Sequence, residues 1–457
     1  MSKTIAEEMA DFSSALTYQS LPSDVVEHVK FHVMNILGLC IPSAKLEAGG
    51  VAAKVVKQWG GVKEATVIAS KYRAPAASAA LANGAMAHVL DFDDTHNESF
   101  VHVGPPVIPA ALAMGERQKV NGKTLITAIA AGMETAIRVG MIAPGQLSKI
   151  GFHPTSIWGI FGAYTAASKI LQLKNNQIVN GFGVCGSQSA GILEFFSDGS
   201  WVKQFHPGWA AHSGIVSALM TQNGMTGPKS VFEGRFGVYK THLGQADLAL
   251  QRVVEGLGQR WEIPRIAYKP YPCGVVLHPF LYCASKLKKE HRLDVDNIKK
   301  VKCTVPSGMV PLVCEPAQEK VMPRSVYDGR FSLYFTVAAM LVDGKVDIST
   351  FSNSKIGNKK ILELARNVEY QIDPNIDYPK YIPGDITVEM KSGENYQCKV
   401  NTNPGGPDLP MTKNDHIAKF RSNTAKALPR ATTDRILDRI DKLEHVSDIR
   451  SIMRLCA

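Results

Sequence analysis

Three long stretches without a charged residue set the main limit on how this chain can fold. They cover residues 150–168, 175–193 and 204–228, and they are rich in Ala, Gly and Ser. Each approaches or exceeds the length of about 20 residues that a membrane-spanning helix needs. They also contain polar residues such as His153 and His206. Small uncharged residues of this kind are typical of helices surrounded by other helices, so we predict a helical core and no membrane span.

Helical periodicity extends over most of the first two-thirds of the chain. After Ser23, which we predict to be an N-cap, apolar residues recur at three- and four-residue intervals from Val25 to Leu37. The same pattern predicts further helices at 75–90, 107–118, 123–142 and 155–171. Runs of β-branched residues bounded by turns are scarce before residue 260.

The pattern changes after about residue 265. Residues 299–306 alternate and are rich in valine, as expected of a strand, and residues 386–400 predict a hairpin. Helices are predicted at about 277–290 and 329–342, and again in the amphipathic tail from residue 413 onward. The expected fold is therefore mainly α. It has a large all-helical domain formed by both chain ends, 1–266 and 406–457, and a smaller inserted α/β (α+β) domain at 267–405.

Charge and cysteine content narrow the classes of function. The chain has 457 residues, with 51 Lys and Arg against 41 Asp and Glu, which gives a net charge of +10. This excess suits an anionic partner, but the basic residues are dispersed, so we do not expect nucleic acid. The eight cysteines form no C-x-x-C pair, and the first 20 residues carry several charges without an apolar signal segment. We therefore expect reduced thiols and a cytoplasmic protein.

The densest group of reactive side chains lies at Asp91-Phe92-Asp93-Asp94-Thr95-His96, with His102 six residues further on. These residues directly follow the helix predicted at 75–90. Four acid or imidazole groups within six residues cannot all be buried and charged without partners or shifted pKa values. The alternatives are a solvated loop, a metal site and a site of proton transfer. Because Asp and His ligate metals but no H-E-x-x-H motif occurs, the metal site is the least favoured.

Two further candidate residues lie within or next to the uncharged stretches. His153 lies in GFHPTS (151–156), near the start of a predicted helix, where backbone N–H groups favour an anion. A histidine before a proline is equally common in a turn. Lys203 is the last charge before residues 204–228. It either extends from a helix end into solvent or holds a carboxylate in a cleft.

The second part of the chain adds three candidates with equally open roles. Lys269, in YKPYPC, lies where the pattern changes, and ligand clefts favour domain borders, although a solvated lysine is the simpler interpretation. His278 begins a predicted helix, as a cap, a core residue or a ligand contact. Tyr334 lies on an apolar helix, where it either fills the core or donates a phenolic proton.

Several known cofactor and nucleophile motifs are missing. Residues 122–124 (GKT) lack the earlier glycine of a phosphate-binding loop, and no G-x-S-x-G occurs. Residues 181–186 (GFGVCG) match G-x-G-x-x-G, but without a strand–helix context and with His206 where an acid would be expected. The cysteine spacing offers no iron–sulfur cluster. Chemistry based on Asp, His, Lys and Tyr alone points to proton transfer.

The motifs taken together resemble the MmgE/PrpD family. The matching segments keep the family's order and span nearly the whole chain: HVLDFDDTH (88–96) with His102, GFHPTS (151–156), DGSWVKQFHPGWAAHSG (198–214), GPKSVFEGRFG (227–237), YKPYPCG (268–274) and GRFSLYF (329–335). Known members include 2-methylcitrate dehydratase, cis-aconitate decarboxylase and iminodisuccinate epimerase. The resemblance implies a helical domain with a smaller α/β lid domain, a homodimer, and neither a metal nor an organic cofactor.

The resemblance also implies a set of site residues. Carried over residue by residue, the family's cleft contains Asp91, Thr95, His102, His153, Lys203, Lys269, His278 and Tyr334. The sequence departs from the family at Val103, because many members have a proline after the histidine that matches His102.

Proton transfer next to a carboxylate fits these residues. Dehydration, decarboxylation and epimerisation of such acids can all pass through a carbanion or enolate, whose charge lysines and helix N-termini can offset. His102 is the best candidate to move the proton, and Tyr334 or Asp93 would orient the groups or donate a second proton. Asp91, Thr95, His153, Lys203, Lys269 and His278 would bind the substrate. We therefore expect a cofactor-independent lyase for a small anionic di- or tricarboxylate, with an epimerase of an imino- or amino-dicarboxylate, or a non-catalytic carboxylate-binding relative, as alternatives.

Overall fold

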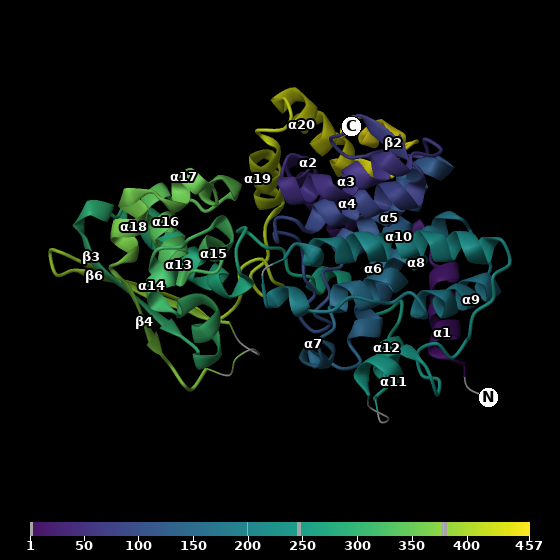
Figure 1. Cartoon of the computed structure of the whole chain (residues 1–457), viewed down its shortest axis with the longest axis horizontal. Helices are drawn as coiled ribbons and strands as arrows, with labels where there is room; N and C mark the ends of the chain where they lie inside the picture. The colour runs from purple at the N-terminus through teal and green to yellow at the C-terminus, as the bar shows by residue number, and fades with distance from the viewer. Residues whose placement is uncertain (1–2, 199, 245–247, 377, 379–381) are drawn as a thin grey trace. The chain divides into compact units, whose positions relative to one another are not determined.

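The computed structural model describes residues 3–198, 200–244, 248–376, 378 and 382–457 (Figure 1). The chain divides into two compact units, each with its own hydrophobic core. The helical unit comprises Met1–Val89, Asp93–Ala267 and Lys413–Ala457, and the mixed unit comprises Leu90–Phe92 and Tyr268–Thr412. The short segment Leu90–Phe92 groups with the mixed unit, although nothing in the sequence pattern separates it from its neighbours.

The helical unit consists of α-helices and one small hairpin in the part of the chain that the structure describes. Its helices are α1 (Ile5–Ala15), α2 (Ser23–Ser43), α3 (Glu47–Trp59), α4 (Ala76–His88), α5 (Gly104–Gln118), α6 (Gly122–Gly140), α7 (Gln146–Ile150), α8 (Pro154–Ile170), α9 (Asn175–Gly186), α10 (Val202–Gln222), α11 (Val238–Leu243), α12 (Gln251–Val254), α19 (Lys413–Thr424), α20 (Arg430–Asp441) and α21 (Arg450–Met453). The hairpin pairs β1 (Ala65–Val67) with β2 (Tyr72–Ala74).

The core of this unit is formed by α4, α5, α6, α8 and α10, which pack on one another; α4, α5, α6 and α8 are almost entirely buried. Small residues allow these helices to approach closely. A Cβ atom on Gly84 of α4 would lie 2.7 Å from the Cα of Gly208 in α10. The crossing of α4 and α10 therefore requires glycine, and this explains why the uncharged stretches are rich in small residues.

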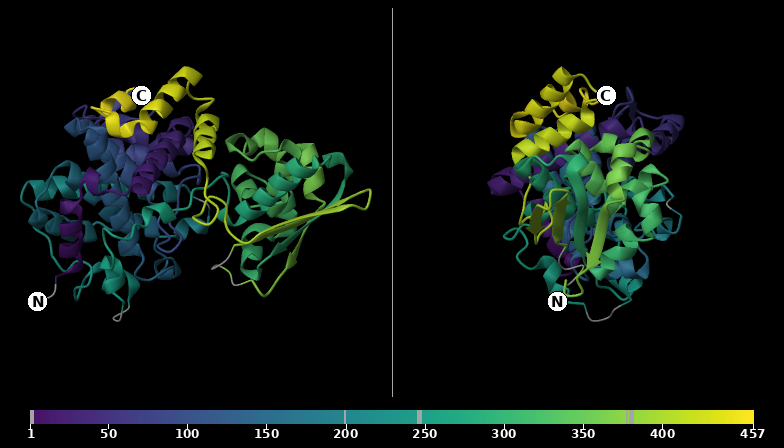
Figure 2. Two further views of the ribbon diagram at one scale, coloured as in Figure 1. Left: turned by 180° about the vertical axis from the view of Figure 1, so that it is seen from behind. Right: turned by 90° about the vertical axis from the view of Figure 1, so that its left-hand side faces the viewer.

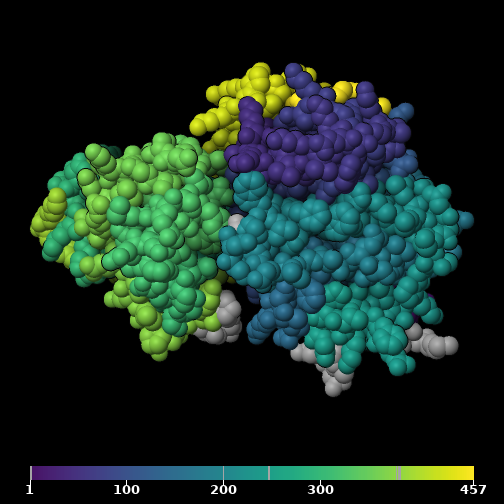
Figure 3. Space-filling model, viewed as in Figure 1, coloured from purple at the N-terminus to yellow at the C-terminus, as the bar shows by residue number. Residues whose placement is uncertain are grey.

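The C-terminal helices return to the beginning of the chain. Helix α19 packs along α2, and α20 also contacts α2. Figures 1 and 3 show the C-terminal segment, in yellow, beside the N-terminal helices, in purple. Ile436, Ile440 and Leu443 are completely buried there, in keeping with the amphipathic tail predicted from the sequence.

The mixed unit contains a four-stranded sheet and short helices. Its elements are α13 (His278–His291), β3 (Ile298–Val305), α14 (Ala317–Val321), α15 (Val326–Arg330), α16 (Leu333–Asp343), α17 (Asn353–Ile356), α18 (Lys359–Ala365), β4 (Val368–Ile372), β5 (Gly384–Met390) and β6 (Asn395–Val400). The strand order is β4-β3-β5-β6, in which β3 and β4 run parallel and the other pairs antiparallel.

One face of this sheet is buried against helices. Helix α13 packs on β5 and β6, and α16 contacts β4 (Figure 2). Every second residue of β5 is buried, including Ile386 and Val388, while Asp385 and Thr387 between them are partly exposed. This alternation is the period of two that a sheet with one covered face imposes.

The coarse fold prediction is confirmed: the chain is mainly helical, with a small mixed sheet in its C-terminal region. The predicted hairpin at 386–400 is β5–β6, with Gly393 at a positive φ of 96° in its turn. Ser23 is not an N-cap, because Pro22 takes the cap position and Ser23 is the first helical residue. The strands β1, β2 and β4 were not predicted.

The described helices were also compared with the requirements of a membrane span. No single one of them is both long and apolar enough to cross a bilayer. Helices α2 and α3 meet the test only as a pair, and they are bent by 89° relative to each other.

Candidate functional site

A buried carboxylate that accepts hydrogen bonds from two histidines is the most unusual feature of the helical unit. Oδ2 of Asp93 lies 2.8 Å from Nδ1 of His102 and 3.0 Å from Nδ1 of His88. The side chains of Asp93 and His88 are fully buried, while that of His102 is 14% exposed. His102 is therefore the member of this group that solvent can reach.

The end of α4 and the start of α5 place this group. His88 is the last residue of α4, and Asp93 follows five residues later. The neighbouring Asp94 holds the next helix, because its Oδ1 accepts from the backbone N–H of Gly104 and its Oδ2 lies 2.8 Å from Nδ1 of His32. A Cβ atom on Gly104 would lie 2.4 Å from Oδ2 of Asp94, so only glycine fits at the start of α5.

Threonine side chains fix His102 on two sides. Oγ1 of Thr95 lies 3.1 Å from Nδ1 of His102. The backbone N–H of His102 donates to Oγ1 of Thr155, which belongs to the first turn of α8. Residues from 95 to 155 thus converge on one imidazole, and the sequence-predicted residues Thr95 and His102 are brought together.

A second pair of imidazoles lies next to the first. His153 is the N-cap residue of α8, and its Nδ1 lies 2.9 Å from Nδ1 of His206 in α10. The ring centroids of His153 and His88 are 5.9 Å apart, and those of His153 and His102 are 6.4 Å apart. The structure therefore gathers four imidazoles around Asp93, which we call the histidine cluster: His88, His102, His153 and His206.

Burial and charge set the protonation of this cluster. Burial lowers the pKa of His88 and of His206 to about 4, and it lowers the pKa of His153 well below its usual value. The positive charge of Lys203, in the first turn of α10, acts on all three in the same direction. These imidazoles are thus neutral at pH 7.

Asp93 remains ionised in this surrounding. Burial by itself raises the pKa of its carboxyl group, but the electrostatic interaction and the hydrogen bonds with the Nδ1–H groups of His88 and His102 outweigh this effect and hold the pKa well below the usual range. An ionised carboxylate only accepts hydrogen bonds, so the Nδ1 atom of each of these imidazoles carries the proton. Among the described residues, neither Nε2 of His88 nor Oδ1 of Asp93 has a hydrogen-bond partner, although both are buried.

The same residues have the chemistry of metal ligands. His88, Asp93 and His102 offer ligand atoms within 4.8 Å of one another. A cation would need deprotonated ligand atoms facing it, whereas here the Nδ1 protons of both imidazoles are shared with Asp93. The geometry therefore favours a hydrogen-bonded network.

The mixed unit holds Lys269 and Asp91 together. Nζ of Lys269 donates to the backbone oxygen of Asp91 at 2.8 Å and lies 3.0 Å from its Oδ1. The lysine side chain is 7% exposed. Arg330, at the end of α15, donates to the backbone oxygen of Leu90 at 3.1 Å and is half-buried. Two cations of this unit therefore bind the short segment Leu90–Phe92.

His278 and Tyr334 both lie within the mixed unit. His278 is completely buried at the start of α13, with its Nε2 3.3 Å from the backbone oxygen of Cys273. Tyr334, near the start of α16, belongs to the core of this unit, and burial raises its pKa. Its phenol therefore stays protonated at neutral pH and can act only as a hydrogen-bond or proton donor. No contact described here tests the site roles of these two residues, which stay predictions.

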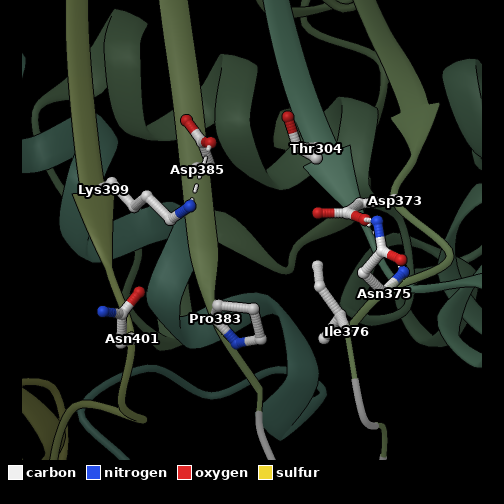
Figure 4. Close-up of a pocket in the computed structure, with 8 residues that line it drawn as sticks. All are labelled: Thr304, Asp373, Asn375, Ile376, Pro383, Asp385, Lys399 and Asn401. Atoms are coloured by element: carbon white, nitrogen blue, oxygen red, sulfur yellow. Dashed lines mark hydrogen bonds and ion pairs between the residues drawn. The ribbon is translucent and has the colours of Figure 1, made fainter.

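A pocket of about 340 Å³ lies on the open face of the sheet (Figure 4). Its polar groups pair among themselves: Asp385 accepts from Gln397 and lies 4.0 Å from Lys399, and Asp373 accepts from Asn375. None of the residues predicted from the sequence lines this pocket. We therefore place the candidate site at the histidine cluster instead.

The G-x-G-x-x-G match at 181–186 lies within α9. Its glycines serve helix packing, since a Cβ atom on Gly181 would lie 2.0 Å from Oη of Tyr164. A dinucleotide site needs this motif in a turn between a strand and a helix. The motif is therefore structural here.

Two family models match most of the chain. Residues 7–251 match the MmgE/PrpD N-terminal domain, and residues 271–445 match the MmgE/PrpD C-terminal domain. The chain belongs to the MmgE/PrpD family. The resemblance inferred from its motifs is thereby confirmed.

The curated relatives of this MmgE/PrpD protein carry one activity in their names. Human cis-aconitate decarboxylase is 26% identical over 463 residues, covering 98% of this chain and 93% of the relative. A cis-aconitate decarboxylase-like protein of Aspergillus oryzae is 24% identical over 468 residues, covering 99% of this chain and 97% of the relative. Cis-aconitate decarboxylase of Aspergillus terreus is 24% identical over 481 residues, covering 99% and 95%.

Sequence reasoning missed three of the residues described above. His88, His206 and Arg330 were all part of the quoted motifs, but no role was predicted for them. A usable signal existed for His88, because it ends the alanine-rich helix directly before the acidic residues. For His206 and Arg330 the contacts span 53 and 240 positions, so no local pattern indicates them.

Proposed function

We propose that this protein is a lyase that acts on a small di- or tricarboxylate, such as cis-aconitate or 2-methylcitrate, by proton transfer at a carbon next to a carboxylate. The observation that carries the proposal is the Asp93–His102 hydrogen bond of 2.8 Å, with His102 as the solvent-accessible member of the histidine cluster. The names of the relatives support a decarboxylation. The homodimer implied by the family resemblance stays a prediction.

The protonation of His102 fits such a reaction. With its Nδ1–H donated to Asp93, the imidazole presents Nε2 as the atom that takes up or delivers a proton. The Asp93 carboxylate stabilises the imidazolium form that arises in between. In a decarboxylation, Nε2 first takes up a proton from solvent and then delivers it to the carbanion that loss of CO2 leaves. In a dehydration, Nε2 instead removes a proton from the carbon, and hydroxide leaves as water after it is protonated.

The charges around the histidine cluster favour an anion. His88, His153 and His206 are neutral, and the negative charge of Asp93 is compensated by its hydrogen bonds. The charge of Lys203 reaches these imidazoles. A substrate carboxylate beside Lys203 would balance this charge. Lys203 would then also stabilise the negative charge that develops on the substrate when the enolate forms.

An epimerase of an imino- or amino-dicarboxylate is the second candidate. The neighbouring pair His153–His206 favours it, since an epimerase removes a proton on one face of a carbon and returns one on the other. The pair offers a second imidazole near His102, although its ring centroid is 6.4 Å away. A relative that only binds carboxylates would not need imidazoles placed to accept or donate a proton.

Proton NMR in D2O distinguishes these functions in one experiment. Citrate, 2-methylcitrate, cis-aconitate and iminodisuccinate are each incubated with the protein, and the spectra show loss of water, loss of CO2 or exchange of the α-proton. The proposal expects turnover of a tricarboxylate, either by loss of CO2 to a product with deuterium at the carbon that gains the proton, or by loss of water to an unsaturated product. Exchange without bond cleavage would support the epimerase, and no change in any acid would contradict both.

Chelation tests the absence of a metal from the mechanism. We expect activity to survive dialysis against EDTA, because the two Nδ1 protons next to Asp93 leave these ligands engaged with one another. Activity is measured before and after dialysis and after adding back Zn²⁺, Mg²⁺ or Mn²⁺. Loss on dialysis with recovery by one stoichiometric metal would turn His88, Asp93 and His102 into a metal site.

A further inference from the structure

The imidazole of His88 shares one carboxylate oxygen with the proposed proton carrier. Oδ2 of Asp93 accepts from Nδ1 of His88 at 3.0 Å and from Nδ1 of His102 at 2.8 Å. The two rings lie edge to face with centroids 4.7 Å apart. His88 is 1% exposed and is not among the residues carried over from the family's cleft.

We propose that His88 is a positioning residue, which acts on the reaction only through the Asp93 oxygen that it shares with His102. Its hydrogen bond holds the Asp93 carboxylate in place for His102. The same hydrogen bond stabilises the negative charge of the carboxylate, which therefore stabilises the imidazolium form of His102 less strongly. The inference rests on the proposed function, because the proposed function assigns the proton transfer to His102.

The shared oxygen first fixes the tautomer of both rings. The ionised Asp93 cannot donate, so His88 and His102 must each bring a proton on Nδ1. His102 is therefore held with a bare Nε2, ready to accept a proton. The same holds for His88, whose Nε2 is buried without a hydrogen-bond partner among the described residues, so His88 has no route to solvent of its own.

The second donor also limits the basicity of His102. A carboxylate favours the protonated form of a neighbouring imidazole, and a hydrogen bond from elsewhere reduces the charge that it offers. With the His88 donor removed, Asp93 would interact with His102 alone. The imidazolium form of His102 would then be favoured, and the enzyme would need a higher pH to work as a base.

Other groups near His102 would stay in place in this comparison. Thr95 contacts the same Nδ1, and the ring of His153 lies 6.4 Å away. The charge of Lys203 and the imidazole of His206 face the neighbouring rings from α10. In the sequence, Asp91 precedes Asp93 by two residues and pairs with Lys269 in the mixed unit. A change at His88 alone therefore isolates its own contribution.

Two substitutions of His88 distinguish the effect of losing its Nδ1–H donor from the effect of losing its imidazole ring. His88→Leu removes the donor and keeps much of the volume, whereas His88→Asn is the matched control, because its amide N–H can replace Nδ1–H. For wild type and both variants, kcat/KM is measured between pH 5 and pH 9. We expect the limb of the profile that His102 sets, the acid limb for a dehydration and the alkaline limb for a decarboxylation, to move upward by about 0.5–1 pH unit in His88→Leu. In His88→Asn it should stay within about 0.2 unit of wild type.

An NMR measurement tests the inference without relying on activity. The whole chain is labelled with 15N-histidine, the His102 signals are assigned with His102→Asn, and those of His88 with His88→Asn. In the wild type at pH 8, both rings must show a protonated Nδ1 and a bare Nε2. The titration of the His102 signals must then move to higher pH in His88→Leu, in parallel with the limb of the pH profile that His102 sets.

The outcomes distinguish the two proposals. A bare Nδ1 on either ring of the wild type, or a His102 titration unchanged in His88→Leu, would overturn the role of His88 while leaving the lyase proposal intact. If the wild type converts no acid, the lyase proposal fails, and the NMR titration alone still decides whether His88 acts on His102. If His88→Leu does not fold, His88→Phe provides the donor-free ring for the same comparison.

Discussion

Asp93 is the residue of the candidate site that most needs hydrogen-bond donors around it. A completely buried carboxylate without partners would take up a proton, because the interior solvates charge poorly. Here His88 and His102 each donate to it, and its pKa stays low. Two histidine side chains are thus enough to keep the Asp93 carboxylate ionised inside a helical core. The chemistry proposed for His102 depends on that acceptor.

We expect His102→Asn to separate chemistry from binding. Asparagine keeps a hydrogen-bonding side chain of similar size but cannot carry a proton near neutral pH. Loss of a general acid or base lowers kcat by about 10²–10⁴-fold, and KM should change little, as for interactions made in the transition state. Steady-state kinetics and deuterium incorporation from D2O measure both. A near-normal kcat would show that another group carries the proton, and His153 and Tyr334 would then be the next candidates.

The two lysines of the predicted site should respond differently. Lys203→Ala removes a charge that acts on the histidine cluster, and we expect kcat/KM to fall by about 30-fold or more at an unchanged melting temperature. Lys269→Ala also breaks the contact with Asp91, and losing one partner of a buried pair costs about 3–5 kcal/mol, so its melting temperature should fall as well. The exposed Lys149 provides the control Lys149→Ala. Equal melting temperatures of both lysine variants would contradict the structural role of Lys269.

At the level of helices, the crossing of α4 and α10 positions the site. His88 ends α4, while Lys203 and His206 lie in the first turns of α10. The two helices approach at Gly84 and Gly208, close enough that backbone atoms touch. Any change in this crossing therefore moves the histidine cluster apart.

We expect Gly208→Ala to destabilise the protein and to lower activity together. The new Cβ atom would lie 2.3 Å from the backbone oxygen of Leu81, so the helices must separate. Overpacking of this kind costs about 1–3 kcal/mol in free energy of unfolding. The control is Gly50→Ala in α3, where the nearest atom is 3.9 Å away and alanine should stabilise by up to about 1 kcal/mol. Urea denaturation compares them, and equal midpoints would refute the packing argument.

For the whole molecule, buried neutral histidines make stability depend on pH. Burial lowers the pKa of His28, His88 and His206 to about 4, and that of His416 to about 3. In the unfolded chain these imidazoles titrate near 6.5, so between pH 6.5 and about 4 the unfolded state binds more protons. The stability is thus complete above pH 6.5 and is lost as the pH falls toward 4.

The melting temperature should accordingly stay nearly constant from pH 7.5 to about pH 6.5 and fall between about pH 6.5 and pH 5. Each pH unit below 6.5 removes up to about 1.4 kcal/mol per buried histidine. His416 stacks on Phe31 with centroids 4.4 Å apart, so His416→Gln should reduce the slope, while His445→Gln, at an exposed position, should not. A melting temperature independent of pH in this range would show that these histidines are not buried as neutral groups.

Local patterns in the sequence were enough to predict most of the elements. Helices such as α6 and α13 carry their own period of 3.6, and the β5–β6 hairpin carries its own turn. The missed strands lack such a signal: β1 and β2 have three residues each, and only the first residue of β4 is buried. Short or exposed strands are held by their neighbours rather than by their own alternation.

By itself, the sequence determined the helical core, the hairpin, the candidate residues and the family, because each of these depends on residue type, spacing or motif order along the chain. Only the tertiary structure decided which groups touch. It paired Lys269 with Asp91 over 178 positions and His153 with His206 over 53. It also placed His88 and His102 on a single oxygen of Asp93. Protonation depends on burial and on such partners, and these are set by the packing of helices that are distant in sequence.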